Sequence, residues 1–315
     1  MKTVAFAGGV GGARLADGLR RVLPPEDLTV VVNTADDFEH LGLRISPDLD
    51  TVIYTLAGIE NPETGWGRAE ESWDFLDALA RLGGPTWFRL GDRDLAVHVL
   101  RTSLLASGQR LSAVTASIAG AFGIQVSLLP MSDDPVRTVV STDDGELAFQ
   151  EYFVARGCRP VVRGFRFEGA EEARPAPGVL EAMMQADVIL LAPSNPWVSL
   201  DPILAVPGIR QALRSKLVIG VSPIVGGRAL KGPAAKMAAE LGLPVSAETV
   251  AAHFLPVLSG FVIDTTDADQ AAAIEQRGLR TLVTNTIMRD GECRATLAAE
   301  MLALAKGFAS GSRAA

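Results

Sequence analysis

Short apolar runs alternate with longer stretches of helical pattern along most of the chain. Two such runs, residues 4–7 and 28–32, flank a helical pattern over residues 13–22. Each run is too short for a helix and ends in turn-forming or polar residues, which is typical of buried strands. Strands separated by helices favour a mostly parallel sheet with helices on both faces. Further runs of the same kind predict strands at residues 188–192, 217–221, 261–264 and 281–284.

The middle of the chain follows a different pattern. Between residues 125 and 167, polar and apolar residues alternate around Asp143-Asp144-Gly145, a sequence that favours the tight turn of an antiparallel hairpin. Residues 309–315 are predicted to form a flexible tail. We therefore predict a Rossmann-like α/β domain with a smaller β-rich insertion, the domain formed by residues 1–124 and 170–308 and the insertion by residues 125–169.

A glycine-rich segment, Gly8-Gly9-Val10-Gly11-Gly12, follows the first predicted strand and opens the first predicted helix. Glycine lets the backbone approach a phosphate closely, and the N–H groups at a helix N-terminus attract anions. The dinucleotide fingerprint G-x-G-x-x-G/A is not met, because Arg14 occupies its last position. No Gly-Lys-Ser/Thr follows, so this is not a Walker loop. The segment predicts an anion site that uses Gly9, Gly11 and Gly12, or else a tight turn without a ligand.

Four aspartates gather at and beyond the end of the second predicted strand. Asp36 and Asp37 follow the strand closely, and Asp48 and Asp50 come soon after. Open parallel sheets bind ligands at the carboxyl ends of their strands, and several carboxylates without matching Lys or Arg suit a hard cation such as Mg²⁺. Other interpretations stay open: Asp36 bonds a ribose hydroxyl, Ser46 or Asp48 caps a helix with Pro47 in its first turn, or the loop is simply solvated.

Two later strands end in loops rich in hydroxyl, amide and glycine groups. Residues 192–197 contain Ser194 and Asn195, and residues 222–227 begin with Ser222. Neutral hydrogen-bonding groups at strand ends suit the recognition of a nucleotide base or a phosphate. The same sequences are also compatible with ordinary turns that need no ligand.

Signals for other kinds of chemistry are weak. His40, His98 and His253 are scattered and fit no His-Glu-x-x-His pattern, so a zinc site is not indicated. No Gly-x-Ser-x-Gly elbow is present, which gives nucleophilic hydrolysis little support. Residues 89–94, Arg-Leu-Gly-Asp-Arg-Asp, alternate in charge around a glycine and are, on their own, typical of surface ion pairs.

Composition and charge narrow the class of partner. The 315 residues carry a formal charge of -8, which disfavours a nucleic-acid surface because such surfaces need clustered Lys and Arg. A small-molecule partner is therefore expected. No segment approaches the roughly 20 apolar residues of a membrane span. Cys158 and Cys293 are too few and too distant for a disulfide framework, so we expect reduced thiols and a cytoplasmic location.

These segments, taken together, resemble the CofD/FbiA family of transferases. The joint occurrence of these motifs in this order is far more specific than any one of them. The motifs extend from the first strand to well past the middle of the chain. The matching segments are Ala7-Gly8-Gly9-Val10-Gly11-Gly12-Ala13, Val32-Asn33-Thr34-Ala35-Asp36-Asp37, Ser46-Pro47-Asp48-Leu49-Asp50-Thr51, Gly91-Asp92-Arg93-Asp94, Leu129-Pro130-Met131-Ser132-Asp133-Asp134, Phe149-Gln150-Glu151, Pro193-Ser194-Asn195-Pro196 and Val221-Ser222-Pro223-Ile224.

The resemblance implies a reaction in the biosynthesis of coenzyme F(420). A phosphorylated three-carbon acid, activated as its guanosine diphosphate derivative, is transferred to the ribityl hydroxyl of the deazaflavin Fo. GMP leaves, and the product is F(420)-0 or its dehydro form. The acid is 2-phospho-L-lactate, phosphoenolpyruvate or 3-phosphoglycerate, and the sequence does not distinguish among them. Mg²⁺ is the expected cofactor, and a homodimer is common in the family.

The resemblance also implies roles for single residues. The residues expected to contact Fo are Asp50, Arg89, Asn33 and Asp92. Those expected to hold the guanosine diphosphate portion of the donor are Gly9, Gly11, Gly12, Ser194, Asn195 and Ser222. The expected magnesium ligands are Asp36, Asp37 and Asp50, and of these Asp50 and Asp37 are the candidates for a catalytic role. Whether a given aspartate holds the metal or accepts the ribityl proton as general base stays open.

Two other classes of protein are weighed against this assignment. A regulatory or nucleotide-sugar-binding protein of cell-envelope metabolism would share the glycine loop and the Pro-Ser-Asn-Pro loop. The presence of both Ser-Pro-Asp-Leu-Asp-Thr and Gly-Asp-Arg-Asp argues for the Fo-using branch instead. A nicotinamide oxidoreductase is the weakest alternative, because Arg14 breaks the dinucleotide fingerprint.

Overall fold

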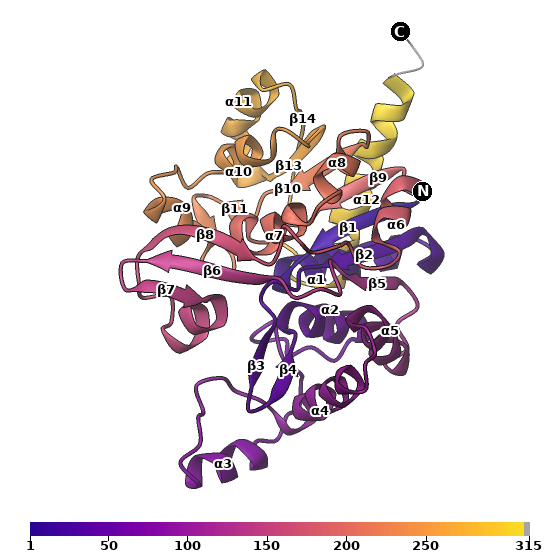
Figure 1. Ribbon diagram of the computed structural model, residues 1–315. Helices are drawn as coiled ribbons and strands as arrows, with labels where there is room; N and C mark the ends of the chain where they lie inside the picture. The colour runs from indigo at the N-terminus through magenta and orange to yellow at the C-terminus, as the bar shows by residue number, and fades with distance from the viewer. Residues whose placement is uncertain (312–315) are drawn as a thin grey trace.

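A seven-stranded parallel sheet forms the centre of the protein, as seen in the computed structural model (Figure 1), which describes the backbone of residues 1–311 and the side chains of residues 1–308. Every neighbouring pair of strands in this sheet runs parallel. The predicted mostly parallel α/β sheet is therefore confirmed. From edge to edge the strands are β14 (Arg280–Thr284), β13 (Gly260–Asp264), β10 (Val218–Val221), β9 (Val188–Leu191), β1 (Thr3–Ala7), β2 (Leu28–Val32) and β5 (Ser127–Pro130).

The order of the strands identifies a doubly wound, Rossmann-type sheet. From β1 the chain proceeds to β2 and β5 on one side, and it then returns to β9 and continues outward through β10, β13 and β14 on the other side. Such a reversal opens a crevice at the carboxyl ends of the two strands where it occurs, here β1 and β9. The edge strand β5 pairs with β2, although it lies inside the range 125–169 that was predicted to form the insertion.

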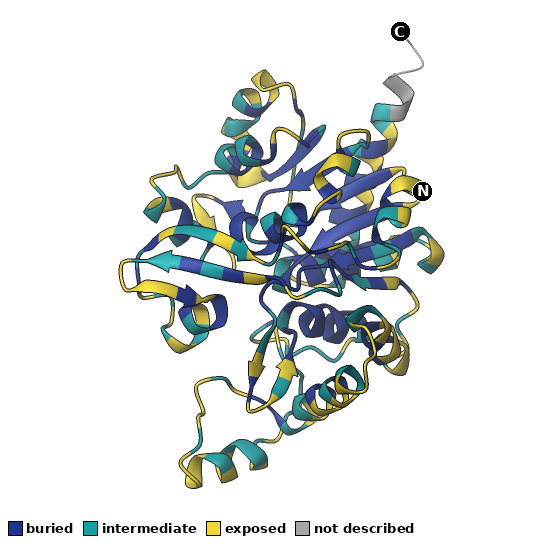
Figure 2. Cartoon of the chain, in the orientation of Figure 1, coloured by how far each residue is buried: buried dark blue, intermediate teal, exposed yellow. Residues whose placement is uncertain are grey.

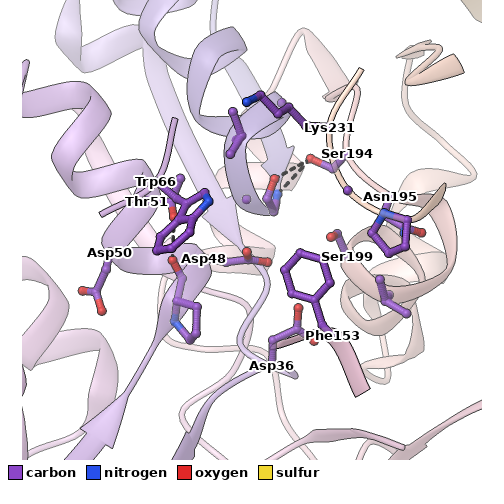
Figure 3. A pocket seen from close by; sticks show the side chains of 18 of the residues that line it. Asp36, Asp48, Asp50, Thr51, Trp66, Phe153, Ser194, Asn195, Ser199 and Lys231 are labelled. Atoms are coloured by element: carbon purple, nitrogen blue, oxygen red, sulfur yellow. Dashed lines mark hydrogen bonds between the residues drawn. The ribbon is translucent and has the colours of Figure 1, made fainter. Parts of the chain in front are cut away.

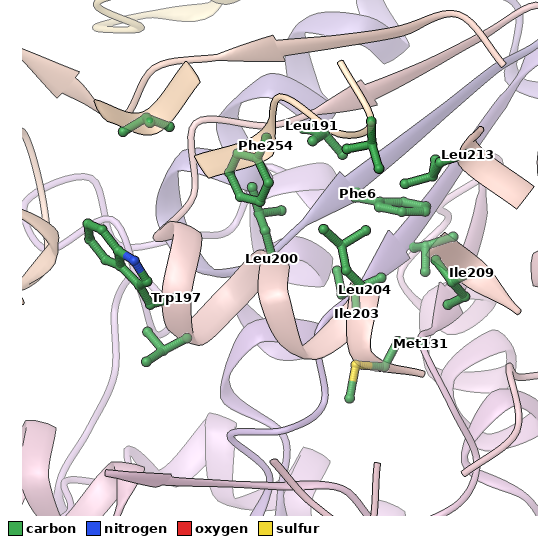
Figure 4. Close-up of a cluster of buried hydrophobic side chains, with 14 of the residues drawn as sticks. Phe6, Met131, Leu191, Trp197, Leu200, Ile203, Leu204, Ile209, Leu213 and Phe254 are labelled. Atoms are coloured by element: carbon green, nitrogen blue, oxygen red, sulfur yellow. The ribbon is translucent and has the colours of Figure 1, made fainter. Parts of the chain in front are cut away.

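The sheet is covered by a separate hydrophobic cluster on each face. Alternation along β1 sends Val4 and Phe6 into one cluster and Ala5 and Ala7 into the other. Figure 2 shows the buried strands, and Figure 4 shows Phe6 packed among side chains of the first face. Helices of the first face are α6 (Val179–Gln185), α7 (Asp201–Ala205), α8 (Ile209–Leu213), α9 (Ala234–Glu240), α10 (Ala247–Phe254) and α11 (Ala271–Gln276); those of the second are α1 (Gly9–Val22), α2 (Pro47–Ala57), α5 (Leu111–Ala121) and α12 (Gly291–Gly311).

The predicted hairpin is present in a small antiparallel sheet beside the main one (Figure 1). Strand β6 (Arg137–Thr142) pairs with β7 (Gly145–Ala148), with Asp143 and Asp144 between them, and also with β8 (Val162–Glu168). Gly145, at the end of the turn, has a φ of 101°, which favours glycine. The alternating pattern therefore predicted this hairpin and its turn.

Further elements lie outside the main sheet. The β3 (Phe38–His40) and β4 (Leu43–Ile45) hairpin lies beside α4 (Asp92–Ala106), and α3 (Asp74–Arg81) lies furthest from the sheet (Figure 1). Helix α12 extends to Gly311, and the rest of the predicted tail lies outside the described residues. The remaining elements are β11 (Ile224–Val225), β12 (Arg228–Ala229) and the short helical segments Pro25–Asp27, Glu151–Ala155, Pro196–Leu200 and Thr265–Gln270.

Candidate active site

The loops after β1 and β9 are joined at the point where the strand order reverses. The Ser194 hydroxyl accepts a hydrogen bond from the backbone N–H of Gly8 at 3.1 Å and donates one to the Gly8 carbonyl at 2.7 Å. Ser194 therefore ties the two loops together. The loops form one unit at the carboxyl edge of the sheet, which is where parallel α/β sheets bind ligands.

Close packing and backbone conformation explain why glycine occupies positions 9 and 11 of the loop. A Cβ atom at Gly11 would lie 2.1 Å from the Pro193 carbonyl oxygen, and Gly9 adopts a φ of 45°. A larger residue at either position requires a shift of backbone or a strained conformation. Because these glycines let α1 begin directly against the 193–199 loop, the N-terminus of α1 faces the space above the sheet.

A cavity of about 510 Å³ opens above this junction (Figure 3). Its size falls within the range of small-molecule sites. The predicted site residues that line it are Gly9, Gly11, Asp36, Asp50, Arg89, Ser194, Asn195 and Ser222. Four other predicted residues, Gly12, Asn33, Asp37 and Asp92, are not among its lining residues.

Asp36 and Asp48 are buried carboxyl groups on the cavity wall. Burial raises the pKa of Asp36 well above its usual value, and the charges of Asp48 and Asp37 raise it further. Burial also raises the pKa of Asp48 to about 6, although hydrogen bonds from Asn33 and the Gly9 backbone oppose this shift. The Asn33 amide donates a hydrogen bond to the Asp48 carboxylate at 2.9 Å, so Asn33 holds a cavity-lining side chain without lining the cavity itself. Two neighbouring buried carboxylates of this kind favour a proton or a cation between them.

Asp37 supports the start of α2. The Ser46 hydroxyl donates to its carboxylate at 2.6 Å, and burial raises the pKa of Asp37 well above its usual value. Of the two residues that the sequence offered as the cap, Ser46 occupies the N-cap position of α2, and Pro47 lies in the first turn. The side chain of Ser46 serves Asp37 rather than the helix backbone.

Asp50 lines the cavity from α2 and is paired with a buried cation. Both of its carboxylate oxygens accept hydrogen bonds from the Arg101 guanidinium, whose side chain is only 2% exposed. Behind this pair, His98 Nε2 lies 3.2 Å from an oxygen of Asp94, and Tyr54 donates to the same oxygen. Burial acts to raise the pKa of Asp94, but the neighbouring His98, the hydrogen bond from Tyr54 and the positive charge of Arg101 lower it overall.

Two groups of side chains are able to hold a metal ion. Asp50, Asp94 and His98 bring three ligand atoms within 4.8 Å of one another, so the part of the chain that the structure describes contains a possible metal triad. Arg101 already supplies this group with a positive charge. At Asp36, by contrast, the oxygen Oδ1 is buried without a hydrogen-bond partner. The pair Asp36 and Asp48 therefore fits a hard cation, whose preferred ligands are carboxylate oxygens.

Aromatic side chains form another part of the cavity lining. Trp66 and Trp87 line it while remaining 54% and 38% exposed, so the cavity has two large aromatic groups open to a ligand. The Arg89 guanidinium lies 4.3 Å from the centre of the Trp73 ring. Asp92 instead accepts hydrogen bonds from the backbone of Asp74 and Phe75 at the start of α3.

Asn195 and Ser222 reach the cavity but have partners inside their own loops. The Asn195 side chain accepts a hydrogen bond from the Trp197 backbone N–H at 3.1 Å and lies 3.2 Å from the sulfur of Met237. The Ser222 hydroxyl bonds the backbone N–H and carbonyl of Ile224. These side chains shape the loops, and their contact with a donor stays a prediction.

Several cavity residues were not identified from the sequence. On α4, Asp94, His98 and Arg101 recur at intervals of four and three residues, which places them on one helical face. Such polar residues on a face turned toward the core are a detectable signal. Trp66 and Trp87 lie outside regular elements, where no periodic pattern marks them.

Within the described residues, none of the helices combines the length and apolar character needed to cross a bilayer. The fold is similar to that of a UPF0052 family member from Bacillus halodurans, with a TM-score of 0.60 at 15% identity, covering 90% of this chain and 92% of that one. At this identity the likeness concerns the fold alone.

Sequence comparison gives a more specific result. A phosphoenolpyruvate transferase from Streptomyces griseus is 46% identical over 314 residues, covering 97% of this chain and 99% of the relative. A 2-phospho-L-lactate transferase from Methanosarcina mazei is 39% identical over 289 residues, covering 92% and 95%. The family model described as 2-phospho-L-lactate transferase CofD matches residues 3–298. The resemblance found in the motifs is confirmed: this chain belongs to the CofD family and is a transferase of coenzyme F(420) biosynthesis.

Proposed function

We propose that this enzyme transfers a phosphorylated three-carbon acid from its guanosine diphosphate derivative to the terminal ribityl hydroxyl of Fo, releasing GMP. The observation that carries the proposal is one cavity whose lining combines two unlike sets of residues. One set is the glycine loop at the N-terminus of α1, and the other is Trp66, Trp87 and Arg89. The first set suits phosphates, and the second suits a planar heterocycle.

Phosphoryl transfer between two bound substrates requires positioning and charge neutralisation more than a protein nucleophile. The N–H groups at the start of α1 are proposed to hold the pyrophosphate, and the hydrogen bonds between Ser194 and Gly8, which fix that end of the helix, support this role. Asp50 lies across the cavity with its carboxylate held by Arg101. In this position it is the candidate to orient the ribityl hydroxyl and accept its proton.

Magnesium fits the acidic side of the cavity. Asp36 and Asp48 are proposed to hold it, because both line the cavity and one oxygen of Asp36 has no other partner. When bound, magnesium would neutralise charge on the phosphoryl oxygens. Asp50 remains a further candidate ligand, since it belongs to the group with Asp94 and His98. Asp37 is proposed to support the site through Ser46 rather than from the cavity wall.

Phosphoenolpyruvate is the acid that we expect, because the Streptomyces griseus relative at 46% identity carries that name, whereas the phospholactate transferase relative is 39% identical. A cytoplasmic location and a homodimer are proposed on the same family basis. A regulatory or nucleotide-sugar-binding role would require none of the chemistry described above.

The proposal is tested by incubating the enzyme with Fo, Mg²⁺ and each of the three guanylylated acids in turn, and following the loss of Fo by chromatography. We expect conversion of Fo with at least one donor, and the fastest conversion with guanylylated phosphoenolpyruvate. If nucleotides bind but no donor converts Fo, a binding or regulatory role is supported and the proposal is wrong.

A further inference from the structure

Arg14 places a positive charge on the cavity wall. It lies in α1, one turn beyond the glycine loop, and lines the cavity together with Gly9 and Gly11. Within the described residues its guanidinium makes neither a hydrogen bond nor an ion pair. Side chains on a helix lean toward its N-terminus, so the guanidinium is directed back to the level of the loop.

The surroundings of Arg14 leave its charge available. Glu60 is the carboxylate that acts on it, but Glu60 is already paired with Arg294 at 3.4 Å. Burial and then the like charge of Arg294 lower the pKa of Arg14. A half-buried guanidinium beside another cation costs stability unless an anion pairs with it. The missing anion is therefore expected to come from the ligand.

The position of the guanidinium is defined by the segment that carries Trp66. An added Cβ atom at Gly65 would lie 3.5 Å from Nη2 of Arg14 and 3.0 Å from Val10. The guanidinium thus lies where the Gly65 backbone meets α1, next to the glycine loop. In dinucleotide-binding folds this sequence position holds glycine or alanine to allow close packing. Here Gly11 makes the close contact with Pro193, which leaves position 14 open to a long side chain.

Charge counting indicates which part of the donor Arg14 meets. The doubly esterified pyrophosphate carries two negative charges, and the acid adds a carboxylate. Among the cavity-lining residues the Lys and Arg side chains are Arg14, Arg89 and Lys231. Arg89 packs on Trp73 and is one of the residues proposed to contact Fo. The planar fork of arginine matches a carboxylate with two parallel hydrogen bonds, whereas lysine is a point charge suited to phosphate.

We infer that Arg14 binds the carboxylate of the transferred acid and selects guanylylated carboxylic acids over simple esters of guanosine diphosphate. The inference rests on the proposed function and concerns a feature that all three candidate acids share. It also explains why a residue that breaks the dinucleotide fingerprint occupies this position.

The test compares two ligands that differ only in the carboxylate. Guanylylated 2-phospho-L-lactate is compared with the isopropyl ester of guanosine diphosphate, in which a methyl replaces the carboxylate, by isothermal titration without Fo. The wild-type protein should prefer the carboxylate ligand by roughly tenfold to a hundredfold. Arg14→Gln should bind both ligands equally, at the wild-type affinity for the isopropyl ester, and Arg14→Lys should retain part of the preference.

Lys231→Gln is the matched control, because it removes another cavity-lining cation and should leave the preference intact. Thermal unfolding of each variant checks that the fold is preserved. An unchanged preference in Arg14→Gln would contradict the inference, as would an equal loss of affinity for both esters, which would indicate a pyrophosphate contact. If the wild-type protein binds neither ligand, the proposed function itself is wrong.

Discussion

Asp50 and Arg101 are 51 residues apart in sequence and form a buried ion pair directly behind the cavity wall. The pair holds the carboxylate of Asp50 in one orientation with both oxygens engaged. It also places a permanent positive charge next to the residue proposed to meet the ribityl hydroxyl. Removing either partner alone leaves the other charge buried, which typically costs about 3–5 kcal/mol.

Asp50→Asn keeps the shape of the side chain and removes its charge. We expect turnover to fall by roughly a hundredfold or more if Asp50 is a base or a metal ligand. Donor binding without metal should change little or tighten, as a negative charge is lost. Because Arg101 would be left unpaired, the double variant Asp50→Asn with Arg101→Gln serves as a control for folding. A near-normal turnover with a raised KM for Fo would show that Asp50 only positions Fo and is neither base nor metal ligand.

Magnesium removal should abolish turnover, because Asp36 and Asp48 form a carboxylate pair on the cavity wall. Activity in excess chelator is the measurement, with restoration by added Mg²⁺ as its control. Asp36→Asn should raise the Mg²⁺ concentration needed for half-maximal activity by about tenfold or more. Full turnover in excess chelator would contradict the metal assignment.

The acidic pair also predicts how the stability of the metal-free protein depends on pH. The pKa of Asp48 is raised from 3.8 to about 6. Between these values the folded protein keeps a proton that the unfolded chain has lost, so the free energy of unfolding should fall as pH rises through this window. Asp36, shifted in the same direction, adds to the effect.

Denaturant unfolding of the metal-free protein at several pH values across this window measures the slope. Asp48→Asn should remove part of the dependence of unfolding free energy on pH. Asp77→Asn, at an exposed position, should leave that dependence unchanged. An identical slope in the wild type and Asp48→Asn would show that Asp48 is not the group responsible.

Asn195 has two separable roles, because its oxygen caps the segment Pro196–Leu200 and its amide faces Met237. Asn195→Ala should weaken donor binding more than Fo binding, by on the order of 1 kcal/mol, and lower stability by a similar amount. Asn195→Asp retains the capping oxygen and should restore stability without restoring donor affinity. Equal weakening of both substrates in calorimetric titrations would indicate loss of loop structure instead.

Gly11→Ala tests the close approach of α1 to the 193–199 loop. The added methyl would lie 2.1 Å from the Pro193 carbonyl, so we expect a loss of stability of about 1–3 kcal/mol together with weaker donor binding. Gly120→Ala is the matched control, since this glycine lies within α5 with no atom within 4 Å of an added Cβ. There the change should stabilise the protein by about 0.5–1 kcal/mol. A stable Gly11→Ala variant with normal donor binding would contradict the packing argument.

Local patterns were sufficient to predict most of the sheet. The buried strands on either side of β1 appear as continuous apolar runs, and the hairpin at Asp143 appears as alternation around a turn sequence. Strand β5 was not separated from the insertion, because it is a four-residue edge strand that ends at Pro130 and is followed closely by other strands. Its place in the parallel sheet depends on pairing with β2, which lies about a hundred residues away by the count from Leu28 to Ser127.

The candidate site was predicted in part for a similar reason. The glycine loop and the aspartates at strand ends can be recognised from short segments of sequence, and the fold brings residues of both to one cavity. The partnership of Asp50 with Arg101 joins two helices and has no local signature. The two hydrogen bonds by which Ser194 joins its loop to Gly8 also have no local signature. Side-chain pairing across elements is settled by tertiary packing, which a single sequence does not display.

The most direct test of the proposed reaction is the identity of both products in one incubation. Wild-type enzyme is supplied with Fo, Mg²⁺ and guanylylated phosphoenolpyruvate, and the mixture is analysed by liquid chromatography and mass spectrometry. Attack at the phosphorus next to the acid predicts equal amounts of GMP and the dehydro form of F(420)-0. Formation of guanylylated Fo with free phosphoenolpyruvate, or of GDP without any Fo ester, would contradict the account.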